Sequence, residues 1–257
     1  QPMVRDKKIR QIHLGGGTPT FLTEQQLTRL MELIHQHFTF ADNPEVSIEI
    51  DPRSCSDEKL RHLRKLGFNR VSYGVQDFDK KVQIAINRVQ DIELIAHQLK
   101  LSKELGFESI NLDLIYGLPY QRPETFKKSI EQVIEMDPDR ISVFSYAHLP
   151  QRFAGQKKIP EESIPQPSVK LSLLEQAITQ LNDAGYQFIG MDHFAKKDDG
   201  LAIAQREGRL QRNFQGYTTD GQDALLGLGV SSISQVNGVL WQHEKELPAY
   251  YKMIDNG

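Results

Sequence analysis

The stretch KLGFNRVSYGVQDF, residues 65–78, contains the pattern from which the fold can be inferred. Gly67 follows an amphipathic segment and can adopt the left-handed conformation that ends a helix, and the aromatic Phe68 then begins a strand. The same joint recurs at Leu105–Phe107 and at Ala184–Tyr186. Repeated helix–glycine–strand joints indicate repeated βα units, and therefore a mostly parallel sheet.

The chain alternates between strand-like and helix-like segments as far as residue 195. Helices are recognised by apolar residues at helical spacing, such as Leu27, Met31 and Ile34. The predicted strands are Ile9–Leu14, Val46–Ile50, Arg70–Gly74, Ser109–Leu114, Arg140–Ser145 and Tyr186–Gly190. The predicted helices are Thr23–Phe38, Asp57–Leu66, Ile92–Leu105, Pro123–Met136, Ser168–Ala184 and Lys245–Ile254. Between residue 195 and the last helix we expect loops and short strands.

Each predicted strand ends in glycine or polar residues. Gly15–Thr18 follow the first strand, and Glu49, Gln76 and Asp113 lie at the ends of the next three. In a βα barrel these ends converge on one face, where active sites lie, whereas an open doubly wound sheet gathers them near one switch point. Polar ends on every strand favour a barrel-like fold with six parallel strands, and an open sheet is the alternative.

The composition is that of an ordinary globular protein, with 39% hydrophobic and 25% charged residues and a formal net charge of −3. This balance argues against a bulk nucleic-acid binder, and no apolar run approaches the length of a membrane span.

The single cysteine, Cys55, excludes an internal disulfide, and a cytoplasmic location is the default. Because the chain starts with Gln1, we expect it to be part of a longer protein.

The glycines of HLGGGTPT, residues 13–20, need a physical reason, because consecutive glycines lose much chain entropy on folding. They match neither the G-x-G-x-x-G dinucleotide fingerprint nor a phosphate-binding P-loop, which ends in GK[ST]. A bare backbone edge at a strand end could pair with an extended polar ligand. A tight turn at a barrel corner would explain the glycines equally well.

Four polar side chains are candidates for ligand recognition. Glu49 lies between isoleucines in SIEID, where a carboxylate needs a partner: either a cationic ligand group such as an ammonium, or an ion pair inside the protein. The same reasoning applies to Asp113 in NLDLIYGLP. Gln76 can both donate and accept hydrogen bonds, and Arg88 suits a carboxylate. No histidine or cysteine spacing predicts a metal site, and no residue is assigned a catalytic role.

Several stretches together resemble a known family: HLGGGTPTFL, SIEIDPR, GFNRVSYGVQDF, NLDLIYGLP, DRISVFSYAHLP, GYQFIGMDHFA, QREGRLQRNFQGYTT and LLGLGVSSIS. They are similar to the oxygen-independent coproporphyrinogen III oxidases (dehydrogenases) of bacterial haem biosynthesis, which are radical S-adenosylmethionine enzymes. The resemblance runs from about residue 9 to the end. It implies an α/β fold, a partial (β/α)6 TIM-like barrel of the radical SAM type with a C-terminal extension. Residues 1–195 would form the barrel and residues 196–257 the extension.

The resemblance also implies a reaction and its cofactors. Two S-adenosylmethionine molecules and a [4Fe–4S] cluster would be bound, and one S-adenosylmethionine would be cleaved to a 5′-deoxyadenosyl radical. The radical would remove a β-hydrogen from a propionate of coproporphyrinogen III, and loss of CO2 and one electron would leave a vinyl group. Two such conversions give protoporphyrinogen IX. The implied protein is a cytoplasmic monomer with an electron donor and an electron acceptor, and it has no nucleic-acid partner and no membrane span.

The resemblance assigns cofactor contacts to residues of this chain. Glu49 would accept from an amino group, Arg88 would face a carboxylate, and Gln76 and Asp113 would hold ribose or amino-acid groups. The remaining assignments are backbone contacts and walls. Gly16, Gly17 and Thr18 would lie along the methionine part, Ala147 and Ile233 would form apolar walls, and Phe214 and Gln215 would border the second site.

The sequence departs from the family in one respect. The family binds its cluster through a CxxxCxxC loop after the first barrel strand, and this chain has only Cys55. We therefore expect the first strand and the cluster loop to be missing, the C-terminal helical domain to be cut short, and the chain alone to be inactive. The alternative function is a cluster-less protein of the same superfamily that binds or traffics haem or porphyrin. An unrelated βα-barrel hydrolase or lyase would not explain the motifs together.

Overall fold

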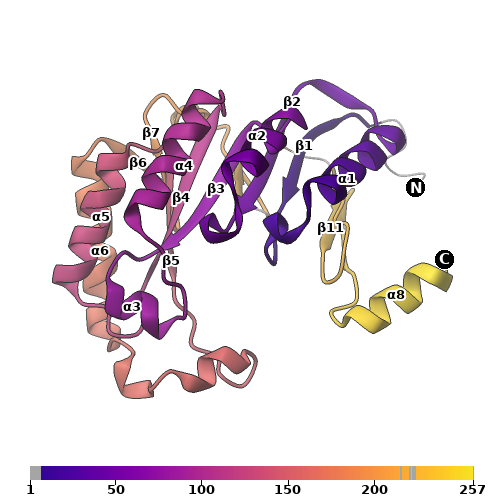
Figure 1. Ribbon diagram of the computed structural model, residues 1–257. Coiled ribbons are helices and arrows are strands. Elements are labelled where there is room, and N and C mark those ends of the chain that lie inside the picture. Colours follow the sequence, from indigo (N-terminus) through magenta and orange to yellow (C-terminus); the bar gives the residue numbers. More distant parts are fainter. Residues whose placement is uncertain (1–6, 215, 220, 222–223, 257) are drawn as a thin grey trace. The chain divides into compact units, whose positions relative to one another are not determined.

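The computed structural model describes residues 7–214, 216–219, 221 and 224–256 (Figure 1). These residues divide into two compact units, Lys8–Ala202 and a C-terminal unit that begins at Ile203. None of the helices in the described ranges is long and apolar enough to cross a membrane. The larger unit contains the main sheet, so it is the unit in which the strand-end residues can be tested.

The main sheet has seven strands in the order β1-β2-β3-β4-β5-β7-β6. Strands β1 to β5 pair in parallel with their neighbours, as the repeated joints predicted. Among the described residues β1 and β6 are the two edges of this sheet. The strand bounds are β1 Ile9–Leu14, β2 Phe40–Ile50, β3 Arg70–Gln76, β4 Ser109–Tyr116, β5 Arg140–Ser145, β6 Tyr186–Gly190 and β7 His193–Lys196.

The six predicted strands lie across the sheet in chain order and run in the same direction, but a strand that was not predicted separates the last two. Strand β7 lies between β5 and β6 and pairs antiparallel with both, so β6 is parallel in direction to β5 without being hydrogen-bonded to it. The reason is a tight reversal at Gly190 and Met191, which have φ angles of +143° and +49°. These conformations turn the chain back, so that His193 pairs with Gly190 on one side and with Ser142 on the other. The segment GMDH is therefore a hairpin turn followed by a strand, and not only the end of a strand.

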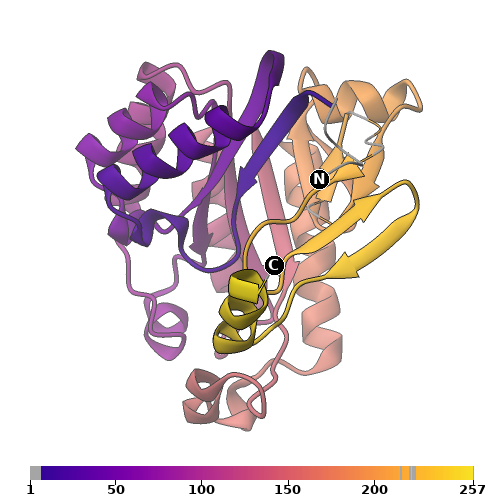
Figure 2. The same cartoon turned by 90° about the vertical axis from the view of Figure 1, so that its right-hand side faces the viewer.

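Helices cover one face of this sheet (Figure 1), and Figure 2 shows the same layer from the side. The core lies between them: Leu27, Leu63 and Phe126 from the helices cluster with Ile48 and Leu112 from the strands. The helix bounds are α1 Glu24–His37, α2 Asp57–Lys65, α3 Lys80–Ala85, α4 Ile92–Glu104, α5 Pro123–Met136, α6 Pro167–Asp183 and α7 Gly200–Arg206. Short 3-10 turns lie at Pro19–Phe21, Pro52–Ser54, Ala154–Lys158 and Glu161–Ser163.

The opposite face of the sheet is polar. Successive residues of a strand point to opposite faces, so the residues between the buried apolar ones share this second face. In β4, Ile110, Leu112 and Leu114 are fully buried, while Asn111 and Asp113 alternate with them. The strand register extends this face across the sheet, because Glu49 pairs with Ser72, Ser72 with Asn111, Gly74 with Asp113, and Asp113 with Ser142.

The described residues of the C-terminal unit comprise the end of α7, short antiparallel strands and the helix α8. Strands β8 (Gln211–Asn213) and β9 (Gly216–Thr218) pair with each other, and β10 (Ala224–Leu225), β11 (Ile233–Val236) and β12 (Val239–Gln242) form a separate sheet. Helix α8, Leu247–Asn256, confirms the helix predicted near the end. Gly227 has to be glycine, because a Cβ there would lie 2.6 Å from the backbone oxygen of Ile233.

The position of the core predicts that substitution of one phenylalanine strongly lowers the free energy of unfolding, whereas substitution of another hardly changes it. Phe126 on α5 is fully buried, whereas Phe21 is 86% exposed. Phe126→Ala should lower the free energy of unfolding by about 3–5 kcal/mol, because it leaves a cavity in a packed core. Phe21→Ala should change it by less than about 0.5 kcal/mol. Urea unfolding followed by circular dichroism measures both, and equal losses would contradict this description of the core.

Candidate cofactor-binding site

The three glycines after β1 differ in their physical reasons for being glycine. A Cβ on Gly15 would lie 2.5 Å from His13 Nε2 and 2.6 Å from Glu49 Oε1. Gly16 has a φ of +101°, a conformation that side chains rarely adopt. A Cβ on Gly17 would meet nothing within 4 Å, and its φ imposes no such limit. The described chain thus explains Gly16 by its backbone conformation and Gly15 only as long as the His13 and Glu49 side chains keep their positions, and it leaves open space at Gly17.

Glu49 reaches the glycine segment from the end of β2. Its Oε1 lies 3.2 Å from His13 Nε2, and its Oε2 accepts a 3.3 Å hydrogen bond from the Gly16 amide. The other ring nitrogen of His13 is 2.9 Å from Ser47 Oγ. Burial by itself would raise the pKa of Glu49, but the hydrogen bond and charge of His13 and the Gly16 amide outweigh it and lower that pKa. Glu49 is therefore an ionised acceptor at neutral pH.

Asp113 lies two strands further along the same polar face. Its Oδ2 accepts from Ser72 Oγ at 2.7 Å and its Oδ1 from Asn111 Nδ2 at 2.7 Å, and Ser142 Oγ donates to Asn111 Oδ1 beside it. Burial raises the pKa of Asp113, and the charge of Glu49 adds to this increase. Both donors are neutral, so within the described residues this carboxyl group has no cationic hydrogen-bond partner. A polar or cationic ligand group on this face would be favoured by it.

Gln76 and Arg88 meet over Gly74. A Cβ on Gly74 would lie 2.7 Å from both Arg88 Nη2 and Gln76 Nε2. The ends of these two side chains therefore occupy space that any other residue at position 74 would need. Arg88 Nη2 donates to the Gly74 carbonyl at 3.1 Å, and its Nη1 lies 3.5 Å from Asp51 Oδ2. Arg53 also pairs with Asp51, at 2.7 Å. Arg88 thus already faces a carboxylate within the chain.

The other predicted contacts are distributed between the two units. Ala147 follows β5, and its carbonyl accepts a 3.1 Å hydrogen bond from Gln156 Nε2. Phe214, which is exposed, and Ile233, the first residue of β11, belong to the C-terminal unit. Gln215 lies outside the described residues. The main sheet therefore carries the candidate residues from Gly16 to Ala147.

Sequence reasoning missed two participants in this site, His13 and Asp51. His13 is the hydrogen-bond partner of Glu49, and Asp51 is the partner of both Arg53 and Arg88. The alternation of IRQIHL and of SIEID places both residues on the polar face, next to residues that were selected. That alternation was the signal that could have identified them.

The described residues do not fit an iron–sulfur cluster. Such clusters need thiolate ligands, and Cys55 is the one cysteine of the sequence. Burial raises the pKa of its thiol to about 12, so it stays protonated at neutral pH. Across residues 7–214 and the described part of the C-terminal unit, no group of three or more His, Cys, Asp or Glu side chains could hold a metal ion.

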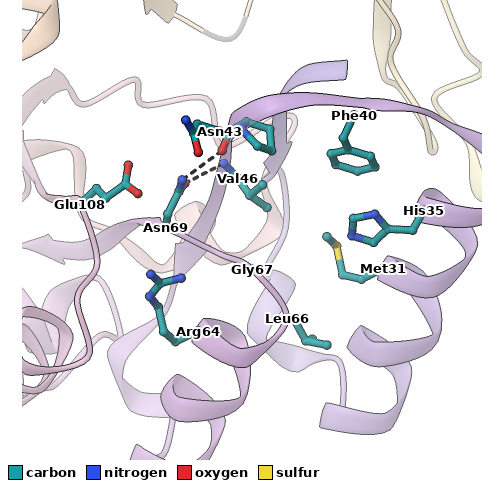
Figure 3. Close-up of a pocket in the computed structure, with 11 residues that line it drawn as sticks. Met31, His35, Phe40, Asn43, Val46, Arg64, Leu66, Gly67, Asn69 and Glu108 are labelled. Carbon is teal, nitrogen blue, oxygen red and sulfur yellow. Dashed lines mark hydrogen bonds between the residues drawn. The ribbon is translucent and has the colours of Figure 1, made fainter. Parts of the chain in front are cut away.

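A pocket of about 480 Å³ lies at the other end of the sheet, beside the amino ends of β2 and β3 (Figure 3). Its wall includes His35, whose ring stacks on Phe40 at 4.2 Å. Its most central amide, Asn69, is occupied by the chain itself, since it accepts from the Val46 amide and donates to the Pro44 carbonyl (Figure 3). None of the candidate cofactor residues lines this pocket. It is separate from the site at the carboxyl ends.

Comparison with known proteins gives consistent results. The profile of the radical SAM superfamily matches residues 3–133. Oxygen-independent coproporphyrinogen III oxidases from Salmonella typhimurium and Escherichia coli are each 53% identical over 254 residues, which is 99% of this chain and 56% of theirs. One from Thermostichus vulcanus is 46% identical over 86% of this chain and 68% of its own length. The chain spans about half the length of the curated relatives from Salmonella and Escherichia that it matches.

Solved structures agree with the sequence relatives. The structure of coproporphyrinogen III oxidase (HemN) from Escherichia coli, described as a radical SAM enzyme, superposes with a TM-score of 0.96 at 52% identity, covering 99% of this chain and 59% of that one. An Elp3 from Methanocaldococcus infernus, with a TM-score of 0.53 at 17% identity over 65% of this chain and 44% of that one, shares the fold alone. Superfamily membership implies S-adenosylmethionine and a [4Fe–4S] cluster as cofactors. By profile, identity and fold, the chain belongs to the radical SAM superfamily.

Proposed function

We propose that this chain is the cofactor-binding α/β part of an oxygen-independent coproporphyrinogen III oxidase, which converts coproporphyrinogen III to protoporphyrinogen IX. The observation that carries this proposal is the 53% identity over 99% of the chain to proteins of that name. The match extends through the C-terminal unit, where a likeness limited to the superfamily profile would stop at residue 133. The substrate and the partners are inferred from the names of these relatives, so they are part of the proposal.

S-adenosylmethionine fits the polar face of the sheet. Open space at Gly17 leaves the backbone of Gly16–Thr18, in the loop that follows β1, accessible to an extended ligand, which can pair with backbone N–H and C=O groups. Glu49, ionised because its pKa is lowered, would accept from the ligand's ammonium. The Arg88 guanidinium would face its carboxylate, while Gln76 and Asp113 would bond to its hydroxyl or amino-acid groups.

We also propose that a second S-adenosylmethionine molecule is bound, with Phe214 and Gln215 at its border. Ala147 and Ile233 are proposed as apolar walls for the cofactor. When bound, S-adenosylmethionine supplies the 5′-deoxyadenosyl radical that takes a β-hydrogen from a propionate, which then loses CO2 and one electron to become a vinyl group. The residues of this chain bind and orient the cofactor for that step. Cluster ligands, an electron donor and an electron acceptor would come from outside these 257 residues, in a monomeric cytoplasmic enzyme.

One observation favours a second candidate function. The thiol of the single cysteine is buried and protonated, which is compatible with a protein that binds or traffics haem or porphyrin without an iron–sulfur cluster. Such a protein would have no need to bind S-adenosylmethionine at the strand ends. Binding of the cofactor by the polar face therefore separates the two functions.

Gly17→Val should block S-adenosylmethionine while leaving the fold intact. The valine methyls would occupy the open space beside the strand edge, where no described atom lies within 4 Å of a Cβ. Gly155→Val is the matched control, because Gly155 is equally open but lies in the segment after β5. Both variants should melt close to the wild type, and only Gly17→Val should lose binding in a calorimetric titration. Normal binding by a folded Gly17→Val would refute this use of the glycines.

Glu49→Ala should weaken S-adenosylmethionine binding by about 1.5–3 kcal/mol, roughly tenfold to more than a hundredfold, because a charged hydrogen bond is lost. Glu45→Ala is the control on the same strand and face, since Glu45 bonds to Arg70 and Gln11 in the middle of β2, away from the strand end that carries Glu49. The dissociation constants of both variants are measured beside their melting temperatures. Equal affinities for Glu49→Ala and the wild type would exclude the proposed role.

The 257 residues expressed alone should take up no stable [4Fe–4S] cluster, because one thiolate cannot replace the several that such clusters need. After anaerobic reconstitution with iron and sulfide, iron content, the visible spectrum and 5′-deoxyadenosine formation under a reductant are measured. Addition of a segment carrying CxxxCxxC before Gln1 should restore all three. Binding of about four irons by the unextended chain would show that the cluster ligands have been misplaced.

A further inference from the structure

The end of β3 contains a strained three-residue turn. The Asp77 amide donates a 2.9 Å hydrogen bond to the Val75 carbonyl, and the central residue, Gln76, has a φ of +67°. A γ-turn with a positive central φ is rare and costly, and more so for a residue with a side chain. The register of β3 and β4 shifts at the same point, between Gly74 and Gln76. Strain of this kind persists only where the surrounding structure enforces it.

The residue that enforces the turn is Asp77. Its side chain is fully buried, and its carboxylate accepts from Ser129 Oγ at 2.7 Å, Gln121 Nε2 at 2.6 Å and the Asp79 amide at 2.8 Å. A buried carboxylate is costly without such donors, and burial still raises the pKa of Asp77. Each donor constrains the direction in which Asp77 points, and therefore the peptide that joins it to Gln76.

The donors to Asp77 belong to the rigid part of the larger unit. Ser129 lies on α5, whose residues Phe126 and Ile130 are fully buried in the core. Gln121 closes the loop after β4, because its Oε1 accepts from the Gly117 amide at 2.6 Å and its Nε2 also donates to the Ile115 carbonyl at 3.0 Å. Asp77 thereby ties the end of β3 to a core helix and to the neighbouring strand end.

The same network fixes the segment that carries Arg88. Gln83 Nε2 donates to the carbonyls of Asp77 and Gln90, both at 3.0 Å. Gln90 Nε2 in turn donates to the carbonyls of Gly74 and Val75. The loop between residues 77 and 90 is thus closed onto the strand end, and Arg88 is held over Gly74 beside the Gln76 amide.

We propose that Asp77 is a positioning residue for cofactor binding, which holds Gln76 in its strained turn and keeps the Gln76 amide and the Arg88 guanidinium together over Gly74. This inference rests on the proposed function, in which Gln76 and Arg88 contact S-adenosylmethionine. Asp77 acts through these residues, since its own carboxylate is consumed by protein donors and is shielded from the ligand. A purely structural Asp77 would instead stabilise the fold without any dependence on Gln76.

Asp77→Asn is the decisive variant, because it keeps the size of the side chain but replaces one acceptor oxygen with an N–H group. This N–H then faces a group that was donating to the carboxylate, either Gln121 or Ser129, and one hydrogen bond is lost. Asp79→Asn is the matched control: Asp79 lies in the same loop and caps α3 through the amides of Lys81 and Val82, a role that asparagine fills equally well. Gln76→Ala and the double variant Gln76→Ala/Asp77→Asn complete a cycle that isolates the coupling between the two positions.

Equilibrium dialysis with labelled S-adenosylmethionine and thermal melts are carried out on the full chain. We expect Asp77→Asn to weaken binding about tenfold, and Asp79→Asn by less than about twofold. In the Gln76→Ala background Asp77→Asn should cause a smaller further loss of affinity than in the wild type, because only the positioning of Arg88 is left to lose. Wild-type affinity in Asp77→Asn, or an equal further loss in the Gln76→Ala background, overturns the proposal. If Asp77→Asn does not fold, Ser129→Ala, which removes one donor, should weaken binding in the same direction, and an unchanged affinity overturns it.

A second measurement needs no ligand. Hydrogen exchange of the amides in residues 75–90 should be faster in Asp77→Asn than in the wild type, while exchange in β1 and β2 stays unchanged. Unaltered exchange in residues 75–90 overturns the proposal. If the wild type binds no S-adenosylmethionine, the proposed function fails, and the exchange experiment still decides whether Asp77 holds the turn. The two failures are therefore distinguishable.

Discussion

Burial of apolar side chains on one face of β2 to β5 commits every second residue of these strands to the other face. Ile48, Val71, Leu112 and Val143 pack against helices, so Glu49, Ser72, Asp113 and Ser142 must share the opposite side. The hydrophobic effect that builds the core thus also gathers the polar groups, although none of them contributes apolar burial. A one-residue slip in any strand would move its polar residues into the core, so the register and the site are specified together.

Polar groups at the strand ends are then held by partners of their own. Glu49 is paired with His13, Arg88 with Asp51, and Asp77 with Ser129 and Gln121. Each carboxylate has its hydrogen-bonding capacity largely met by the chain, which makes burial tolerable and limits its freedom to turn. A site built in this way is rigid before a ligand arrives, so little ordering entropy opposes binding.

The sequence was sufficient for elements whose signals are local. Periodicity and glycine joints predicted β1 to β6 and the longer helices α1, α2, α4, α5 and α6, because each signal lies within one segment; the short helix α3 was not predicted. Strand β7 was also missed, since the reversal that precedes it depends on a positive φ at Met191, which no residue preference predicts. His13 was missed as the partner of Glu49 for a different reason: the two are 36 residues apart, and only the register of β1 on β2 brings them together. Asp77 drew no attention because its role depends on burial, which Ser129 and Gln121 create from other elements.

The glycine triplet shows how structural and functional requirements can be separated within one motif. Gly16 is required by its backbone conformation, so it would be glycine in a protein that bound nothing at this edge. A Cβ on Gly15 would meet only the ends of the His13 and Glu49 side chains, which can shift at low cost. Gly17, like Gly155 after β5, has neither a close neighbour nor a positive φ to explain it, and glycine there loses chain entropy on folding. An open glycine is therefore no sign of a ligand by itself, and the proposed role of Gly17 rests on the variant that fills the space beside it.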